Sequence, residues 1–224
     1  MKELLTSIKI TVNNKLFLKD PESSELGKKI IEHSILLIDE IGFDSFTFKK
    51  LGAIIGSNES SIYRYYENKH KLLLYLTSWY WGWLEYQLVF ETHNIANPKD
   101  QLRKALDIIC RPTMVDSKFE HINEILLNKI VINEFSKSYL TKEVDEENRE
   151  GYFAIYKRLI HRLEVIITAT NPDYPYPISL ASTIVEDSLH QQFLKDHLPS
   201  ITNCNEQISP SDFLMDMVFK ILRK

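Results

Sequence analysis

The sequence predicts an all-α protein, in which an N-terminal three-helix domain with a helix-turn-helix precedes a longer C-terminal helical domain. Apolar residues recur three or four positions apart along most of the chain, which is the spacing of one buried face of a helix. Residues that end helices separate these runs, among them Gly42, Gly56 and Pro112. With 44% of its 224 residues hydrophobic, the chain has enough apolar material for a core.

The composition limits the function and the location. The formal net charge is −4, so the chain as a whole has no basic signature of nucleic-acid binding. No apolar run reaches the length of a membrane span, and the N-terminus lacks the apolar core of a signal peptide. The two cysteines, Cys110 and Cys204, are too far apart for a metal or redox motif, and we expect buried thiols. We therefore expect a soluble cytoplasmic protein without a cofactor or metal.

Residues 1–24 form an arm ahead of the first long helix. Ile8, Ile10 and Val12 alternate with polar residues, and two asparagines follow that tolerate the left-handed geometry of a tight turn. This pattern allows a small β-hairpin, although a lone hairpin is only marginally stable. The favoured alternative is a segment that packs on the helices or on a partner subunit.

The first long helix is predicted between Pro21 and Gly42. Proline and serine residues mark its start, and Gly42 ends it because glycine adopts a positive φ at little cost. Phe43 and Phe46 are expected to fill the corner between this helix and the next. The predicted inward face consists of Ile30, Ile31, Ser34, Ile35, Ile38 and Ile41.

A helix-turn-helix is predicted to follow. Thr47 can cap a short helix, because its hydroxyl can accept a hydrogen bond from an unpaired N–H of the first turn. Gly56 provides the turn, and Asn58 can cap a second short helix that runs to about Tyr65. Two short helices joined by a glycine turn are typical of this motif.

The side chains that the motif leaves facing outward suit DNA. Ser60 and Ser61 are small enough to let the second helix approach base edges. Tyr63 can donate to a phosphate, and Arg64 can reach a phosphate or a guanine edge. Asn68 can cap a third helix, whose N-terminus attracts anions. Further basic residues in this region are Lys49, Lys50, Lys69 and Lys71.

The region has a fixed order of features. It begins with a capped helix and a glycine turn, and a tyrosine cluster, a lysine and a leucine pair follow. The residues in this order are Thr47, Leu51, Gly56, Ile62-Tyr63-Arg64-Tyr65-Tyr66, Lys69 and Leu72-Leu73. Over residues 25–76 this pattern closely resembles the DNA-binding domain of the tetracycline-repressor (TetR) family. Three positions depart from it. Gly52 stands where the family usually has alanine, Ser57 where it has an apolar residue, and Glu59 where a neutral or basic residue is commoner.

The resemblance implies a one-component transcriptional regulator, most often a repressor. A homodimer would place its recognition helices in successive major grooves of two-fold double-stranded DNA. A small apolar or amphipathic effector would release the DNA by favouring a mismatched spacing of the two readers. The implied domains are residues 25–68 for DNA binding and residues 69–224 for ligand binding and dimerisation. The implied DNA-binding residues are Thr47, Lys49, Lys50, Glu59, Ser60, Ser61, Tyr63, Arg64 and Lys69.

A long helix predicted over residues 69–90 is rich in aromatic side chains. They are either core or, for some, the lining of an apolar ligand cavity in which N–H and O–H groups orient the ligand. Four of them share a face at helical spacing, and two more belong to the inward face of a later helix. The ligand-pocket candidates are Trp79, Trp83, Tyr86, Phe90, Tyr152 and Tyr156.

The rest of the C-terminal domain is predicted as helices over residues 98–111, 118–135, 141–169, 178–197 and 210–222. A proline-rich loop separates the third and fourth of these helices. In the family, the last two long helices of each subunit pair across the dimer axis, and ordinary core packing is the alternative here. The dimer-interface candidates are Ile184, Leu189, Phe193, Phe213, Met217 and Ile221.

An enzyme is not indicated. Asp187 and His190 have the spacing of a helical metal motif, but no second acid-x-x-His pair accompanies them, so an i,i+3 hydrogen bond is expected. His161 and Glu164 are likewise expected to form a surface pair. No glycine-rich phosphate loop, nucleophile elbow or HExxH motif occurs. Two alternatives to the regulator remain, a DNA binder without an inducer and a ligand sensor with degenerate DNA binding.

Overall fold

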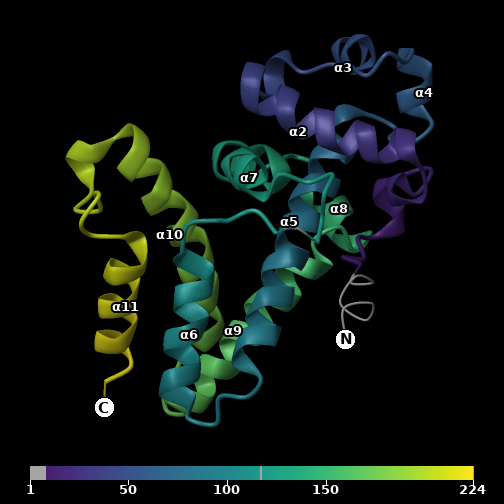
Figure 1. Ribbon diagram of the computed structural model, residues 1–224. Coiled ribbons are helices and arrows are strands. Elements are labelled where there is room, and N and C mark those ends of the chain that lie inside the picture. The colour runs from purple at the N-terminus through teal and green to yellow at the C-terminus, as the bar shows by residue number, and fades with distance from the viewer. Residues whose placement is uncertain (1–8, 117, 224) are drawn as a thin grey trace. The chain divides into compact units, whose positions relative to one another are not determined.

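The computed structural model describes residues 9–116 and 118–223 (Figure 1). No β-strand occurs in these ranges, so the predicted all-α class is confirmed. No helix within them combines the length and the apolar character that a membrane crossing needs. The helical elements are η1 (Asn14–Leu16), η2 (Pro21–Ser23), α2 (Glu25–Ser45), α3 (Phe48–Ile54), α4 (Glu59–Tyr63), α5 (Lys69–Thr92), α6 (Pro98–Cys110), α7 (Glu124–Tyr139), α8 (Val144–Arg149), α9 (Ala154–Thr170), α10 (Pro177–His197), η3 (Pro199–Ile201) and α11 (Pro210–Ile221).

The chain divides into two compact units. Unit 1 comprises Met1–Gly82 and Thr113–Ala154, and unit 2 comprises Trp83–Pro112 and Ile155–Lys224. Unit 1 thus contains α7, α8 and the first part of α5 in addition to the three helices around the helix-turn-helix. The functional division at residue 68 stays a prediction.

The helix-turn-helix in unit 1 has the caps that the sequence predicts. Thr47 Oγ1 accepts a hydrogen bond from the N–H of Lys50 at 3.2 Å, and Asn58 Oδ1 accepts one from the N–H of Ser61 at 2.8 Å. Gly56 adopts φ +65° in the turn between the helices. Helix α3 packs against both α2 and α4. The local signals in the sequence therefore produce the expected motif.

Behind this motif lies a dense apolar core. Gly42, at φ +75°, ends the regular part of α2 as predicted. Phe43 and Phe46 stack in the adjoining corner with their ring centroids 6.5 Å apart. The side chains that α2, α3, α4 and α5 bury almost completely include Ile30, Ile31, Ile35, Leu51, Ile62, Leu72 and Leu73.

The N-terminal arm forms no β-hairpin over its described residues, and Ile8 lies outside them. The N–H of Leu18 donates to the carbonyl of Tyr65 at 2.7 Å, and the side-chain amide of Asn13 donates to the carbonyl of Glu150 at 3.0 Å. The arm is therefore bonded to two distant segments of unit 1, while its internal bonds, such as the ion pair of Lys9 with Asp20 at 2.7 Å, pair no strands over its described residues. The hairpin prediction is wrong over residues 9–24, which contact the rest of unit 1 in the manner of the favoured alternative.

One predicted helix start and one predicted continuous helix are also wrong. Helix α7 begins at Glu124 and not at Lys118, because Asn123 caps it by accepting from the N–H of Leu126 at 3.1 Å. The single long helix predicted after α7 is broken, because Gly151 adopts φ +80° and separates α8 from α9.

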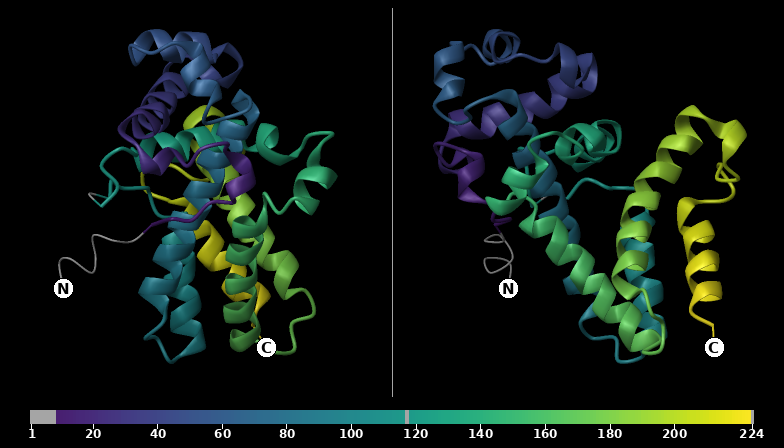
Figure 2. Two further views of the ribbon diagram at one scale, coloured as in Figure 1. Left: turned by 90° about the vertical axis from the view of Figure 1, so that its right-hand side faces the viewer. Right: turned by 180° about the vertical axis from the view of Figure 1, so that it is seen from behind.

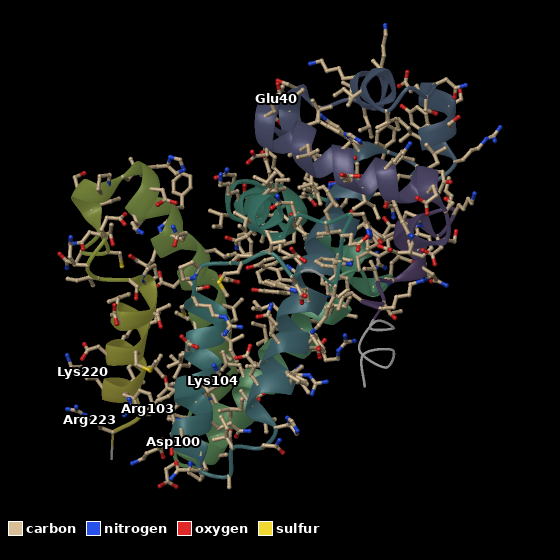
Figure 3. The ribbon with its side chains drawn as sticks, viewed as in Figure 1. Glu40, Asp100, Arg103, Lys104, Lys220 and Arg223 are labelled. Carbon is tan, nitrogen blue, oxygen red and sulfur yellow. The ribbon has the colours of Figure 1, made fainter. Side chains whose placement is uncertain are left out.

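Unit 2 is built around three helices in mutual contact, α6, α10 and α11 (Figures 1 and 2). Asn97 caps α6, and Ser209 with Asp212 forms a capping box at the start of α11. Arg103 extends from α6 (Figure 3), and its guanidinium group lies over the ring of Phe219 on α11, 4.4 Å from the ring centroid. The contact holds the end of α11 against α6.

Candidate DNA-binding surface and effector-binding regions

Helix α4 presents small hydroxyl side chains at its N-terminus. Ser60 is exposed, and its hydroxyl has no hydrogen-bond partner among the described residues. Ser61 Oγ donates to Asn58 Oδ1 at 2.7 Å, so its hydrogen is used within the cap and its lone pairs remain to accept. Glu59 lies half-buried in the first turn of α4. The end of α4 thus carries both donor and acceptor capacity for base edges.

Tyr63 and Arg64 follow at the other end of α4. The Tyr63 ring meets the edge of Phe48 with centroids 5.0 Å apart, while the side chain is 46% exposed. Its hydroxyl makes no hydrogen bond within the described part of the chain. The packed ring fixes the direction of this hydroxyl, which favours a contact with a phosphate. Arg64 is exposed beside it.

The N-terminus of α3 supplies cations. Lys49 and Lys50 are both exposed, and Lys50 Nζ donates to the carbonyl of Ser45 at 2.8 Å, leaving two further donors. Thr47 accepts within the cap, so its hydroxyl hydrogen remains to donate to a phosphate. These groups and those of α4 lie on the same helix-turn-helix, as a DNA-binding surface requires.

Lys69 differs from its predicted role. Its ammonium group donates to the carbonyls of Phe43, Asp44 and Phe46 at 3.0, 3.1 and 3.3 Å. All three donors of the ammonium therefore have acceptors, and the group lies over the Phe43 ring, 4.8 Å from its centroid. We correct the prediction: Lys69 joins the start of α5 to the end of α2 and is not free to bind a phosphate.

The aromatic pocket candidates in unit 1 are parts of its core. Trp79 is 1% exposed and meets the edge of Phe119 with centroids 5.0 Å apart. The Tyr152 ring lies beneath the ammonium of Lys71, 3.9 Å from the ring centroid, and its hydroxyl accepts a hydrogen bond from that ammonium. Both aromatic residues thus fill space between helices of unit 1.

The remaining candidates belong to unit 2 and differ widely in exposure. Trp83 is buried, whereas Phe90 is 57% exposed and stacks on Tyr86 with centroids 5.8 Å apart. Tyr156 donates to Glu186 Oε1 at 3.0 Å. Helical spacing placed Phe90 on the same face as the other candidates, but no described segment covers the C-terminal part of α5 at this position.

A groove in unit 2 was not predicted. Its volume is about 260 Å³, and it lies among the end of α5, the first turn of α6 and the second half of α9. None of the predicted pocket residues lines it. The hydrophobic periodicity of the sequence could not predict the groove. Its exposed valines, Val89 and Val165, recur at the same helical spacing as residues of the buried core. The lining residues are Leu88, Val89, Thr92, His93, Gln101, Arg162, Val165 and Ile166.

A buried carboxylate adjoins this groove. Glu85 accepts from Arg158 at 2.7 to 2.9 Å and from Arg162 Nε at 2.5 Å. Burial by itself would raise the pKa of Glu85, but the hydrogen bonds from the two guanidinium groups outweigh it and lower that pKa. The cluster of one carboxylate and two guanidinium groups therefore carries one surplus positive charge.

The dimer candidates fall into two groups. Ile184 and Leu189 on α10 are 0% and 8% exposed, because other helices of unit 2 cover them. This corrects the prediction for these two residues, since a second subunit does not reach them in this conformation. On α11, by contrast, Phe213 and Ile221 are each 40% exposed. Together with the half-buried Met217 and Phe193, they remain accessible to a partner.

The histidine and carboxylate pairs give no metal site. His161 Nδ1 and Glu164 Oε2 are 2.9 Å apart on the surface, as predicted. Asp187 accepts from Gln191 at 3.3 Å, in place of the hydrogen bond expected with His190. Within the described ranges, no group of three or more potential ligands gathers to hold a metal ion.

No protein-family model matches the chain, and no curated protein matches its sequence. Among solved structures, AibR in complex with isovaleryl coenzyme A and operator DNA is similar to it, with a TM-score of 0.56 and 20% identity over 86% of this chain and 96% of that chain. PfmR, a TetR family transcriptional regulator from Thermus thermophilus, gives a TM-score of 0.57 and 15% identity over 87% and 97% of the two chains.

The chain has the fold of the TetR-family regulators. The superantigen PfiT also shares this fold, with a TM-score of 0.61 and 11% identity over 92% of this chain and 100% of that chain. A TetR fold by itself therefore does not decide the activity. The side chains of the helix-turn-helix bear on the activity more directly than the fold does.

Proposed function

We propose that the protein is a cytoplasmic, non-enzymatic transcription regulator, acting as a repressor, that binds two-fold DNA as a homodimer and is released by a small molecule. The observation that carries the proposal is the helix-turn-helix with capped α3 and α4, whose exposed residues include Ser60, Tyr63 and Arg64. The TetR fold supports it, because AibR was solved in complex with isovaleryl coenzyme A and operator DNA.

The mechanism is a shift between two populations. Two recognition helices in one dimer enter successive major grooves only when their spacing matches the helical repeat of DNA. An effector that binds better to the mismatched arrangement lowers the population that binds DNA, by no more than its differential affinity for the two states. Repression follows if the DNA site overlaps a promoter.

The proposal is tested by anisotropy titration of the purified protein against labelled DNA from upstream of its own gene, at two salt concentrations. We expect a tight, site-selective complex that weakens as salt rises and holds two subunits per site. Weak binding of equal strength on every DNA sequence would contradict a regulator of specific genes.

Tyr63→Phe is expected to weaken DNA binding about 10-fold on a matched and on a scrambled site alike, because one hydrogen bond to a charged phosphate is lost. The Phe ring can keep the edge contact with Phe48, so the free energy of unfolding should stay the same. Parallel anisotropy titrations on both sites measure the effect. A loss confined to the matched site would refute the phosphate contact.

Ser61→Ala provides the matched control on the same helix. The backbone N–H of Ser61 still donates to Asn58 Oδ1, so the cap of α4 is retained. The change should alter the preference among DNA sequences and leave binding to the scrambled site unchanged.

The dimer is predicted to depend on the exposed face of α11. The double variant Phe213→Glu with Ile221→Glu should convert the dimer into a monomer in sedimentation-velocity experiments, because two carboxylates would lose their hydration in the interface. Leu140→Glu is the matched control, since this leucine is 70% exposed in unit 1. Dimers that persist in the double variant would locate the interface elsewhere.

A DNA binder without an inducer is the second candidate. It is favoured by the packing of Trp79 and Tyr152, which are core residues of unit 1. A thermal-shift screen separates the two candidates, since a ligand that binds only the native state raises the melting temperature. A screen in which no compound raises it would favour the second candidate.

A further inference from the structure

We propose that the groove of unit 2 binds a small amphipathic monoanion, a carboxylate on a short aliphatic chain. This inference rests on the proposed function, because it specifies the class of effector that such a regulator would sense. The groove combines an apolar floor, an exposed apolar rim and a guanidinium group with unused donors. No acidic side chain belongs to its lining.

The apolar part of the groove is built by two helices. Leu88 on α5 and Ile166 on α9 are 1% and 6% exposed and form the floor. Val89 and Val165 are 39% and 66% exposed at the rim, so ordinary packing does not account for their position. An aliphatic chain laid between them would remove this apolar surface from water.

The volume limits the length of that chain. About 260 Å³ is roughly the volume that eight or nine water molecules occupy in the liquid. It lies just below the usual range for drug-sized ligands. A carboxylic acid of about six carbons fits this space, whereas a large nucleotide-bearing ligand would extend beyond it.

The charge of the groove selects an anion. Glu85 is one carboxylate between two guanidinium groups, and Arg162 is the one that lines the groove. Arg158 uses both Nε and Nη2 on Glu85, whereas Arg162 uses only Nε within the described part of the chain. The two terminal nitrogens of Arg162 are therefore left to donate to a ligand carboxylate in a bidentate manner.

The other polar lining groups are partly committed. His93 Nδ1 donates to the carbonyl of Phe90 at 2.8 Å, because a carbonyl can only accept. Gln101 Nε2 donates to the carbonyl of Thr92 at 3.2 Å, and the Thr92 hydroxyl donates to that of Leu88 at 2.6 Å. These bonds order the mouth of the groove and leave Arg162 as its cationic donor.

The test uses the full-length protein and hexanoate as the probe, with hexan-1-ol and hexylammonium as neutral and cationic analogues. Saturation-transfer NMR and calorimetry measure binding. We expect millimolar affinity for hexanoate and at least about 10-fold weaker binding of both analogues, since a carboxylate–guanidinium pair is lost.

Arg162→Gln and Arg158→Gln form a matched pair of variants. Each removes one positive charge from α9, and each leaves Glu85 with one arginine partner, so both should fold. Only Arg162 lines the groove, so hexanoate affinity should fall about 10-fold in Arg162→Gln and less than about 3-fold in Arg158→Gln. If Arg162→Gln fails to fold, Val165→Trp fills the groove from an exposed position and should also abolish binding.

Three results would overturn the proposal: no hexanoate binding to the wild type, equal binding of hexan-1-ol, or equal losses in the two arginine variants. The DNA titration is repeated with and without hexanoate to separate this proposal from the regulator function. Hexanoate binding without any effect on DNA affinity supports the site and contradicts its role as effector site. Site-selective DNA binding without hexanoate binding supports the regulator and rejects the site.

Discussion

Gly27→Ala is expected to lower the free energy of unfolding by about 3 kcal/mol. Gly27 lies in the first turn of α2, where the turn η2 passes directly over the helix backbone. A Cβ at this position would be 2.1 Å from the carbonyl oxygen of Pro21 and 2.6 Å from its Cα. Both atoms belong to the backbone, so the whole turn would have to move.

A gain in helix propensity opposes this loss and is smaller. Alanine is better than glycine inside a helix by about 1 kcal/mol, so in an open position the substitution would stabilise α2. Displacing Pro21 also disturbs Glu22, whose carboxylate pairs with His121 at 3.0 Å and accepts from Tyr75 at 3.3 Å. The steric cost therefore dominates the net effect.

Gly56→Ala is the matched control. It has open space around the added Cβ, but φ is +65°, a conformation that costs a residue with a side chain about 1 kcal/mol. Denaturant unfolding of both variants gives the comparison directly. A Gly27→Ala protein as stable as the wild type would show that the arm does not pack on α2 in solution.

Glu124→Gln is expected to stabilise the protein above pH 7 by up to about 3 kcal/mol, and to have little effect near pH 4. Glu124 is fully buried at the start of α7, where one carboxylate oxygen accepts from the N–H of Asp116 at 3.1 Å. The other oxygen has no hydrogen-bond partner among the described residues. Burial raises the pKa of this carboxyl from 4.5 to about 7.

The sign follows from proton linkage. Below pH 4.5 the Glu124 carboxyl is protonated in both the folded and the unfolded chain, so it does not change the free energy of unfolding with pH. Between pH 4.5 and about 7 only the unfolded chain releases the proton, so the free energy of unfolding falls as pH rises. Above about pH 7 the loss in the free energy of unfolding of the wild type stays constant. The glutamine variant does not show this loss, because glutamine does not ionise. The hydrogen bond from Asp116 can be kept by the glutamine carbonyl.

Urea unfolding of the wild type and the variant between pH 4 and 8 measures the predicted difference. Glu150→Gln provides a control of opposite sign, because the hydrogen bond from Lys15 lowers the pKa of Glu150. Its removal should cost stability in full above the ordinary carboxyl pKa, and the cost should shrink as pH falls from there through the lowered pKa. A Glu124→Gln variant whose advantage does not grow with pH would mean that the carboxyl ionises as in water.

Local sequence was sufficient to predict the helix-turn-helix. Thr47 and Asn58 each accept a hydrogen bond from the backbone N–H of the residue three positions later. Gly56 adopts the positive φ of the turn because it has no side chain. The exposed residues Ser60 and Tyr63 follow from helical spacing once these ends are set. Each of these signals lies within a few residues of the feature that it specifies.

Gly52 shows a local departure that only the folded turn explains. A Cβ here would lie 2.7 Å from the carbonyl oxygen of Ser57, which is backbone. Two of the three residues that depart from the family pattern, Gly52 and Ser57, therefore face each other across one tight turn. The sequence showed both changes but not their contact.

Other roles depended on segments that are distant in sequence. Lys69 has the spacing of a phosphate-binding lysine, but carbonyls more than twenty positions earlier take its donors. Phe90 has the spacing of a pocket residue and is exposed, while Ile184 has that of an interface residue and is buried. Arg162 gained its place in a groove from the packing of α5 and α6 beside α9.

The physical reason is the range of the interactions. A cap joins a donor and an acceptor that are already held within one turn, so the local residues specify it almost completely. Burial and the pairing of charges depend on which remote helix covers a side chain, and the same helical periodicity is compatible with a core, a groove or an exposed face. The packing of helices within each unit therefore determines whether an apolar or charged residue lies in the core, in a groove or on an exposed face.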